Sequence, residues 1–168
     1  MLDGIRFAIL TISDRSSRGE RPDTSGPLLS SMVKDNMGKV VKAAILPDER
    51  AAIRAELEAL SDSGTVDVIL TTGGTGFAPR DVTPEATRDA VEREAPGLVE
   101  AMRAESLKKT GTAMLSRAVS GIRKTTLIVN LPGSPKAARE NFEVVIPALA
   151  HAVELLGGRV GDCGSHSV

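Results

Sequence analysis

Short apolar runs alternate with amphipathic stretches along this chain, and that alternation restricts the fold more than any other feature. The stretches with helical spacing include Ile53, Leu57 and Leu60, which recur on one face with charged residues opposite. Four other runs are nearly continuous in apolar residues, as is typical of strands covered on both faces: residues 5–12, 40–46, 66–70 and 125–131. We therefore expect an α/β fold, a three-layer α/β/α sandwich with a mostly parallel sheet.

Residues that favour helix starts mark the boundaries of the first expected helices. Thr24 or Ser25 is suited to cap a helix that follows the first strand. Asp48 stands where a cap for the helix after the second strand belongs. The sequence Thr83-Pro84-Glu85 predicts another start, with threonine as the cap, proline at the first position and an acid in the first turn. A further helix is expected over residues 97–107.

The hydrophobic pattern is less regular in the last third of the chain. Residues 108–121 have no clear period, and we expect loops with short strands there. Ser134-Pro135 opens a helix that Pro147 is expected to break or kink. A length of 168 residues fits one ordinary domain, which we place at 1–157, and we expect residues 158–168 to form a flexible tail.

Composition and charge exclude several classes of function. The formal net charge is −1, and the only aromatic side chains are three phenylalanines, so neither nucleic acid nor an anionic membrane is an expected partner. A single cysteine, Cys163, excludes an internal disulfide, and two histidines, His151 and His166, are too few for a histidine-based zinc centre. The apolar run near the N-terminus is too short for a signal peptide or a membrane span, so we expect a cytoplasmic protein.

Polar and glycine-rich loops follow the four predicted strands, at residues 13–19, 47–50, 71–81 and 132–137. In an open α/β sheet such loops gather at the carboxyl ends of the strands, where ligands bind. They carry carboxylates, hydroxyls and cations: Asp14, Asp48, Asp81, Ser13, Thr75, Ser134, Arg15, Arg80 and Lys136. Several of these loops also lead into helix starts, which favour anions. The combination suits a phosphate-bearing substrate with Mg²⁺.

Each of these features also has a purely structural interpretation. Gly73, Gly74 and Gly76 match neither the Walker loop nor the dinucleotide-binding loop, and a tight turn alone explains them equally well. Asp81 beside Arg80 suits a surface ion pair. Arg117 suits a solvated surface residue. Lys136 is harder to explain in this way, because a cation in the first turn of a helix opposes the helix dipole unless an anion binds there.

The motifs together carry a resemblance to a known family. They are "LTISDR", "PDE", "TTGGTG" followed by "RDVTPEAT", "LSRAVSGIR" and "LPGSPKA", in this order between Ile5 and Leu156. This pattern resembles the MoaB/Mog family of molybdenum-cofactor biosynthesis. The resemblance implies a three-layer fold and a homotrimer. It also implies the activity of a molybdopterin adenylyltransferase, which transfers AMP from Mg-ATP to molybdopterin and releases pyrophosphate.

The resemblance also assigns roles to residues. It places the two essential acids at Asp48 and Asp81, which we also take as candidate Mg²⁺ ligands. It places the nucleotide-contacting loop at residues 73–76. We expect "LSR" and "PGSPK" to serve the pterin side, through Arg117 and Lys136. The residues that the resemblance implies for binding the nucleotide or the pterin are Ser13, Asp14, Gly73, Gly74, Thr75, Gly76, Glu85, Ser116, Arg117, Gly133, Ser134 and Lys136.

Four other members of the wider group compete with this interpretation. MoaB-type relatives share the fold but can lack the Arg-Asp-Val-Thr block, which is intact here. CinA-type hydrolase domains differ within the glycine loop, and molybdenum-insertion enzymes of the MoeA type are much longer. The non-catalytic alternative is a molybdopterin-binding or scaffold trimer. The downstream molybdenum-insertion enzyme is the protein partner that the resemblance suggests.

Overall fold

The computed structural model describes residues 1–158. Cys163, His166 and the expected tail beyond Gly158 lie outside the described residues. Within the described part of the chain, no helix combines the length and the hydropathy needed to cross a membrane.

A six-stranded sheet runs through the centre of the fold, with the strand order β2-β1-β3-β6-β5-β4. Its first four strands in that order are parallel, and β5 pairs antiparallel with both β6 and β4. The four predicted strands and the mostly parallel sheet are therefore confirmed, and β5 falls at the end of the region expected to hold short strands. The strands are β1 Arg6–Ile12, β2 Lys39–Leu46, β3 Val68–Thr72, β4 Arg93–Glu94, β5 Ser120–Arg123 and β6 Thr126–Leu131.

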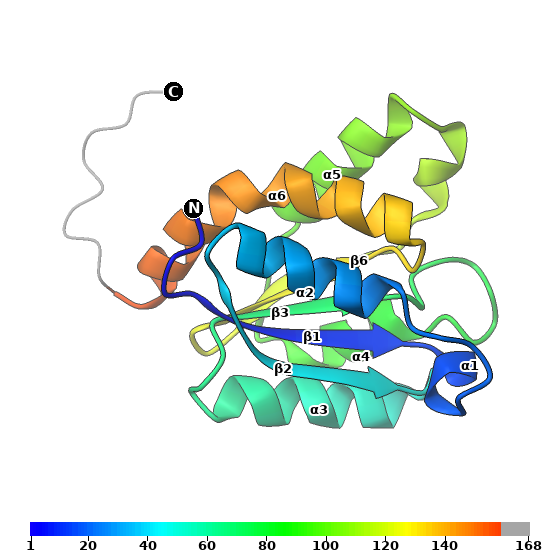
Figure 1. The fold of residues 1–168 in the computed structure, drawn as a ribbon, viewed down its shortest axis with the longest axis horizontal. Helices are drawn as coiled ribbons and strands as arrows, with labels where there is room; N and C mark the ends of the chain where they lie inside the picture. Colours follow the sequence, from blue (N-terminus) through cyan, green and yellow to red (C-terminus); the bar gives the residue numbers. More distant parts are fainter. Residues whose placement is uncertain (159–168) are drawn as a thin grey trace.

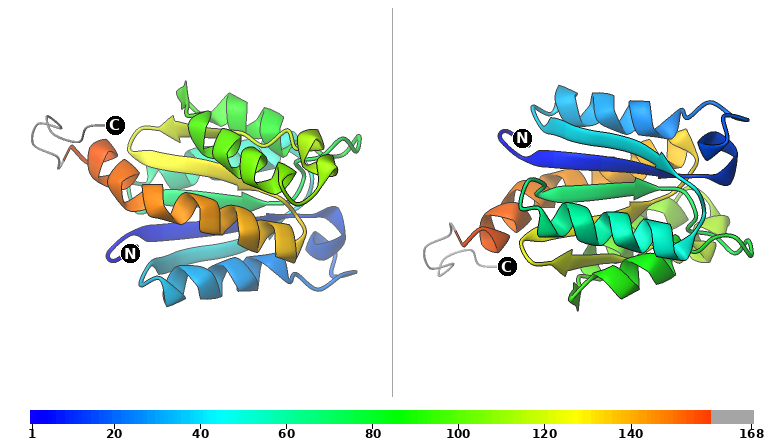
Figure 2. Two further views of the ribbon diagram at one scale, coloured as in Figure 1. Left: turned by 90° about the horizontal axis from the view of Figure 1, so that it is seen from above. Right: turned by 90° about the horizontal axis from the view of Figure 1, so that it is seen from below.

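Helices cover both faces of the sheet, which confirms the α/β/α sandwich (Figure 1). Figure 2 shows α2, α5 and α6 on one face and α3 and α4 on the other. Two short elements, the helix α1 and the 3₁₀ helix η1, were not predicted. The helices are α1 Asp14–Ser17, α2 Ser25–Asp35, α3 Arg50–Asp62, α4 Thr83–Ala90, α5 Gly97–Leu107, η1 Gly111–Leu115 and α6 Pro135–Leu156.

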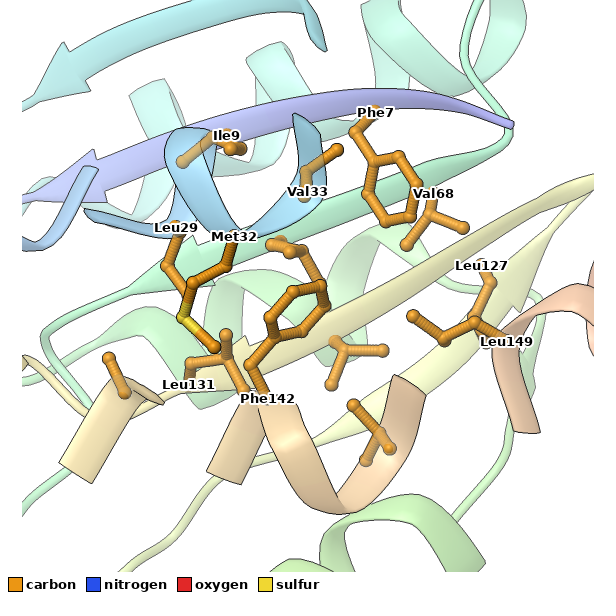
Figure 3. Close-up of a cluster of buried hydrophobic side chains, with 14 of the residues drawn as sticks. Phe7, Ile9, Leu29, Met32, Val33, Val68, Leu127, Leu131, Phe142 and Leu149 are labelled. Atoms are coloured by element: carbon orange, nitrogen blue, oxygen red, sulfur yellow. The ribbon is translucent and has the colours of Figure 1, made fainter. Parts of the chain in front are cut away.

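Alternate side chains of β1 enter the two hydrophobic cores on opposite faces of the sheet. Phe7 and Ile9 join the core under α2, α5 and α6, whereas Ala8 and Leu10 join the core under α3 and α4. In the larger core, Phe7 meets Phe142 of α6 edge to face, with ring centroids 6.4 Å apart and planes at 86° (Figure 3). Such a pair adds about 0.5–1.5 kcal/mol beyond the burial of its area. The run 5–12 is apolar throughout because both of its faces are buried.

Three of the expected helix ends need correction. Thr24 is at the N-cap position of α2, but its side chain makes no capping hydrogen bond. The N-cap of α3 is Glu49 and not Asp48, so the capping interpretation of Asp48 is wrong. Thr83 is the first residue of α4 and not its cap, because its hydroxyl instead donates to the Gly73 carbonyl at 2.9 Å.

The last helix begins as predicted, and it is not broken at Pro147. The Ser134 side chain caps α6 by accepting a hydrogen bond from the Ala137 N–H, and Pro135 is in the first turn. The helix then continues through Pro147 to Leu156 as one element, so the expected break at Pro147 is absent from α6. Proline removes one helical N–H, and packing of the apolar face of α6 against the core outweighs that loss.

Candidate functional site

The carboxyl ends of β1, β2, β3 and β6 lie at one edge of the sheet, where α1 and the loops gather (Figure 1). A polar cleft of about 390 Å³ opens at this edge. Seven of the predicted site residues line it: Ser13, Asp48, Gly73, Gly74, Asp81, Gly133 and Ser134. Loops that lie far apart in the sequence thus contribute to one cavity, as the parallel topology requires.

The glycines of the loop after β3 are required by the backbone. Gly73 has φ +104°, and a Cβ there would lie 2.3 Å from the carbonyl oxygen of Ile12. Gly74 has φ +64°, and a Cβ there would lie 2.3 Å from the Thr83 hydroxyl and 3.1 Å from Asp48 Oδ1. The turn interpretation is therefore sufficient to explain both residues. It does not exclude a ligand, because the same turn presents bare main chain to the cleft.

Asp14, at the start of α1, and Asp48, after β2, hydrogen-bond to each other beside the cleft. The main-chain N–H of Asp14 donates to Asp48 Oδ2 at 2.8 Å, and the N–H of Asp48 donates to Asp14 Oδ1 at 3.0 Å. Arg80 binds both carboxylate oxygens of Asp14 and also pairs with Glu49, so it does not form the expected surface pair with Asp81. The hydrogen bonds from Arg80 lower the pKa of Asp14. Asp14 is thus committed to protein contacts and does not line the cleft.

Asp48 differs from Asp14 in its electrostatics. Burial raises the pKa of Asp48, and the negative charges of Asp14 and Asp81 raise it further. The hydrogen bond from the Asp14 N–H and the charge of Arg80 only partly offset these effects. A half-buried carboxylate with a raised pKa is stabilised by any cation that enters the cleft.

The two carboxylates of the cleft can bind Mg²⁺ together with a substrate, but they are too few to hold a metal ion without other ligands. Among residues 1–158, no group of three or more His, Cys, Asp or Glu side chains is arranged around a metal site. Asp48 and Asp81 both line the cleft, and within those residues Oδ1 of each accepts no hydrogen bond. Mg²⁺ is usually held by one or two carboxylates and completes its shell with water and substrate phosphates. The two carboxylates therefore fit Mg²⁺ with a phosphate ligand.

A second cavity, of about 280 Å³, lies on the other side of the glycine loop. Thr75, Gly76 and Ser116 line it, so the structure divides the predicted residues between two cavities. Its remaining lining includes the apolar Val99 and Met102 of α5. The loop after β3 and the loop after β6 separate the cavities, because Gly73 and Gly133 face the cleft whereas Thr75 and Pro132 face the second cavity.

Four predicted residues line neither cavity: Asp14, Glu85, Arg117 and Lys136. Arg117 is not a solvated surface residue, because its side chain binds Glu85 and two carbonyl groups of the glycine-loop segment. Lys136 is exposed in the first turn of α6 and, within residues 1–158, has no ion-pair partner. Of the two cations expected to bind the pterin, only Lys136 is therefore free to meet an anion.

Several lining residues were not predicted from the sequence. Arg21, Asp23 and Ser25 line the polar cleft, and Arg103 and Lys109 line the second cavity. Arg21 and Asp23 belong to the polar segment that follows β1, and Ser25 is the first residue of α2. The polar composition of that segment indicated that it could contribute to a site. The two cations of the second cavity lie in and after α5, where the sequence indicated only a helix.

Comparison with known proteins places the chain in a family. Residues 8–151 match the family described as "Probable molybdopterin binding domain". A molybdopterin adenylyltransferase of Helicobacter pylori strain J99 is 42% identical over 156 residues, which cover 92% of this chain and 89% of that protein. The solved structure of the molybdopterin biosynthesis enzyme MoaB from Thermus thermophilus superposes with a TM-score of 0.86 at 49% identity, covering 92% of this chain and 97% of that one.

A longer relative shows a similar sequence within a larger protein. The molybdenum cofactor synthesis protein cinnamon of Drosophila melanogaster is 48% identical over 160 residues, and the match covers 95% of this chain. This chain spans only 27% of the length of cinnamon. The family match covers most of the sequence, and two relatives of similar length match almost from end to end. The chain therefore belongs to the molybdopterin-binding MoaB/Mog family of molybdenum-cofactor biosynthesis proteins.

Proposed function

We propose that this protein is a molybdopterin adenylyltransferase. The observation that carries the proposal is the pair of cavities that share the glycine loop as a wall, with two carboxylates on the side of the polar cleft. The full-length relatives named molybdopterin adenylyltransferase support it. In this reaction an oxygen of the terminal phosphate of molybdopterin forms a bond to the α-phosphorus of ATP. The bond from that phosphorus to the bridging oxygen breaks, and pyrophosphate leaves with the electron pair.

We assign the triphosphate of ATP to the polar cleft. Main-chain N–H groups of a glycine turn and of a helix start bind phosphate oxygens without adding side-chain bulk. The turn contributes Gly74 to the cleft, and Ser134, the N-cap of α6, also lines it, whereas the N–H of Gly73 already donates to the Leu131 carbonyl at 3.1 Å. Arg21 adds a cation to its lining. Asp48 and Asp81 would hold Mg²⁺, which when bound neutralises the triphosphate and stabilises the leaving pyrophosphate.

We assign the pterin to the second cavity. Its lining combines apolar side chains, which pack against a flat ring, with the cations Arg103 and Lys109 and the amide of Asn141. Lys136, exposed at the start of α6, is placed to meet an anionic group outside the two cavities. A phosphate that reaches from the second cavity past the glycine loop would approach the nucleotide from one side. In-line displacement needs such an approach opposite the leaving group.

No general base is needed for this chemistry. The terminal phosphate of molybdopterin is already ionised near neutral pH, with a second pKa of about 6 for a phosphate monoester. The chain therefore acts by positioning two anionic substrates and by offsetting their charge.

Three further features belong to the same proposal. We propose a homotrimer, a contact with the downstream molybdenum-insertion enzyme and a cytoplasmic location where ATP is available. The family supports the first two of these by resemblance. Sedimentation of the purified protein tests the trimer directly.

Pyrophosphate release tests the proposed activity. The protein is incubated with ATP, Mg²⁺ and molybdopterin, and pyrophosphate is measured together with adenylylated molybdopterin. We expect both products in equal amounts, and neither when molybdopterin or ATP is left out. Tight binding of molybdopterin without pyrophosphate release contradicts the proposal and supports the non-catalytic scaffold.

A further inference from the structure

In the described part of the chain, Arg117 forms four hydrogen bonds, and all four end on the segment between β3 and the first turn of α4. Its main-chain N–H donates to the carbonyl of Thr75 at 2.9 Å. Its Nε donates to the carbonyl of Gly76 at 2.7 Å, and its Nη2 donates to the carbonyl of Asp81 at 2.6 Å. Its Nη1 pairs with the carboxylate of Glu85. The guanidinium thus ties together the two ends of the loop from Gly76 to Asp81.

The loop that Arg117 closes orients the carboxylate of Asp81. Asp81 Oδ2 accepts a hydrogen bond from the Ala78 N–H at 3.0 Å, and the Asp81 N–H donates to the Ala78 carbonyl at 2.9 Å. The carboxylate also lies against bare main chain, because a Cβ at Gly76 would lie 2.9 Å from Oδ2. These contacts are local to the loop. They place the carboxylate relative to the cleft only if the ends of the loop are fixed. The Thr83 N–H closes the base of the segment by donating to the Gly74 carbonyl at 3.1 Å, and Arg117 binds the loop itself at both of its ends.

Glu85 keeps the guanidinium in place from the other side. Burial alone would raise the pKa of Glu85, but the hydrogen bond and the charge of Arg117 outweigh burial and lower it. Glu85 Oε2 is buried and, in the described residues, has no hydrogen-bond partner. A charged Glu85 therefore depends on Arg117, and the pair spans α4 and the segment after η1.

The loop also forms the boundary between the two cavities. Asp81 lines the polar cleft, Thr75 and Gly76 line the second cavity, and Arg117 lines neither. We propose that Arg117 is a positioning residue that fixes the Asp81 carboxylate and the wall between the two cavities, and that it contacts neither substrate. This inference rests on the proposed adenylyl transfer. It replaces the expected role of Arg117 as a cation that binds the pterin.

The test compares Arg117→Ala with Arg123→Ala. Arg123 is a matched control at the opposite end of the strands, where it pairs with Thr126 at the start of β6. Arg123 likewise donates hydrogen bonds to one carboxylate, that of Asp62, and to one carbonyl, that of Ala90, and it contributes to neither cavity. Steady-state kinetics give kcat and both KM values. We expect kcat of Arg117→Ala to fall by about 10²-fold, the effect of a misplaced reacting group, with each KM changed by less than about threefold. Arg123→Ala should retain kcat.

Two further measurements separate positioning from general destabilisation. Amide hydrogen exchange on the ligand-free protein should be faster in residues 76–81 of Arg117→Ala and unchanged there in Arg123→Ala. Added guanidinium at millimolar concentration should restore part of kcat in Arg117→Ala, and sodium chloride at the same concentration should not.

The outcomes distinguish this inference from the proposed function. If the unmodified protein releases no pyrophosphate, the proposed function fails, and the exchange experiment still reports on the loop. If the unmodified protein is active and Arg117→Ala raises KM for molybdopterin with kcat unchanged, Arg117 is a binding residue and the inference is wrong. Unchanged exchange in residues 76–81 overturns it as well.

Discussion

At the scale of the residue, Asp48 is the side chain whose surroundings differ most from those expected. It does not cap α3, and its Oδ2 accepts a hydrogen bond from the Asp14 N–H while Oδ1 is without a hydrogen bond in the described residues. Asparagine keeps an acceptor for that N–H but removes the charge. We expect Asp48→Asn to lower kcat by about 10²-fold or more, because charge stabilisation by a bound metal contributes several kcal/mol. Pyrophosphate release measures this loss.

The stability of the same variant should move in the opposite direction. Burial and the charges of Asp14 and Asp81 raise the pKa of Asp48 above its ordinary value of 3.8. The native state therefore binds more protons than the unfolded state between those two pKa values, and stability falls as pH rises through that window. Asp48→Asn removes this loss, so its free energy of unfolding at pH 7 should equal or exceed that of the unmodified protein. A clear decrease in urea unfolding contradicts this account.

Asp81 gives a second prediction at this scale. Asp81→Asn keeps an oxygen that can accept the Ala78 N–H, so the loop should remain folded. The charge at the cleft is lost, and we expect adenylylation to fall below detection while the melting temperature stays within about 2 °C. Near-normal pyrophosphate release by the folded variant removes Asp81 from the proposed metal site. Ser63, at the end of α3 and outside the lining of both cavities, offers a control position for a neutral substitution.

At the scale of the element, the turn after β3 shows how strongly geometry restricts the glycine loop. Gly73→Ala places a Cβ 2.3 Å from the Ile12 carbonyl at φ +104°. Gly64 also has a positive φ, of +67°, but a Cβ there meets nothing within 4 Å. We expect Gly64→Ala to cost about 1 kcal/mol of folding free energy, and Gly73→Ala to cost at least about 2 kcal/mol more, because β1 and β3 must move apart. Urea unfolding of both variants measures the difference, and equal costs contradict the close contact.

The elements that were predicted from the sequence are those with long, regular patterns. Strands buried on both faces produce unbroken apolar runs, so β1, β2, β3 and β6 were found within a few residues. The helix α1 and the strand β4 are four and two residues long, too short to show any period. Thr83 resembled a cap, yet its hydroxyl is taken by the carbonyl of Gly73, a contact between turns that local sequence does not encode. The second cavity was missed because α5, η1 and α6 form it only by packing together.

At the scale of the whole molecule, the topology brings two cavities to one edge of the sheet and leaves a thin main-chain wall between them. The wall consists of the turns after β3 and β6, which approach so closely that a Cβ at Gly133 would lie 3.2 Å from the Cα of Gly73. Both turns follow adjacent parallel strands, so their proximity is a property of the fold. Two substrates bound on either side are brought together without any movement of domains.

If each substrate binds in its own cavity, a substitution in one cavity should weaken the binding of one substrate only. Arg103 lines the second cavity and Arg21 lines the polar cleft, and neither forms an ion pair within residues 1–158. We expect Arg103→Ala to weaken molybdopterin binding, and Arg21→Ala to weaken Mg-ATP binding, each by about 1–3 kcal/mol for one lost charge-assisted contact. The affinity of each variant for the other substrate should change by less than about 0.5 kcal/mol, because the wall separates the two ligands.

Calorimetric titration of each ligand into each variant measures all four affinities. Lys136→Ala completes the series, and we expect it to weaken molybdopterin more than ATP, since Lys136 is a cation without an ion-pair partner in the described residues, at the start of α6. Arg123 lies at the end of the strands remote from the two cavities, so Arg123→Ala should change none of the affinities. If Arg103→Ala weakens only ATP and Arg21→Ala weakens only molybdopterin, the substrates occupy the opposite cavities. If each variant weakens both ligands equally, the two cavities act as one site, and the wall formed by the two turns does not separate the substrates.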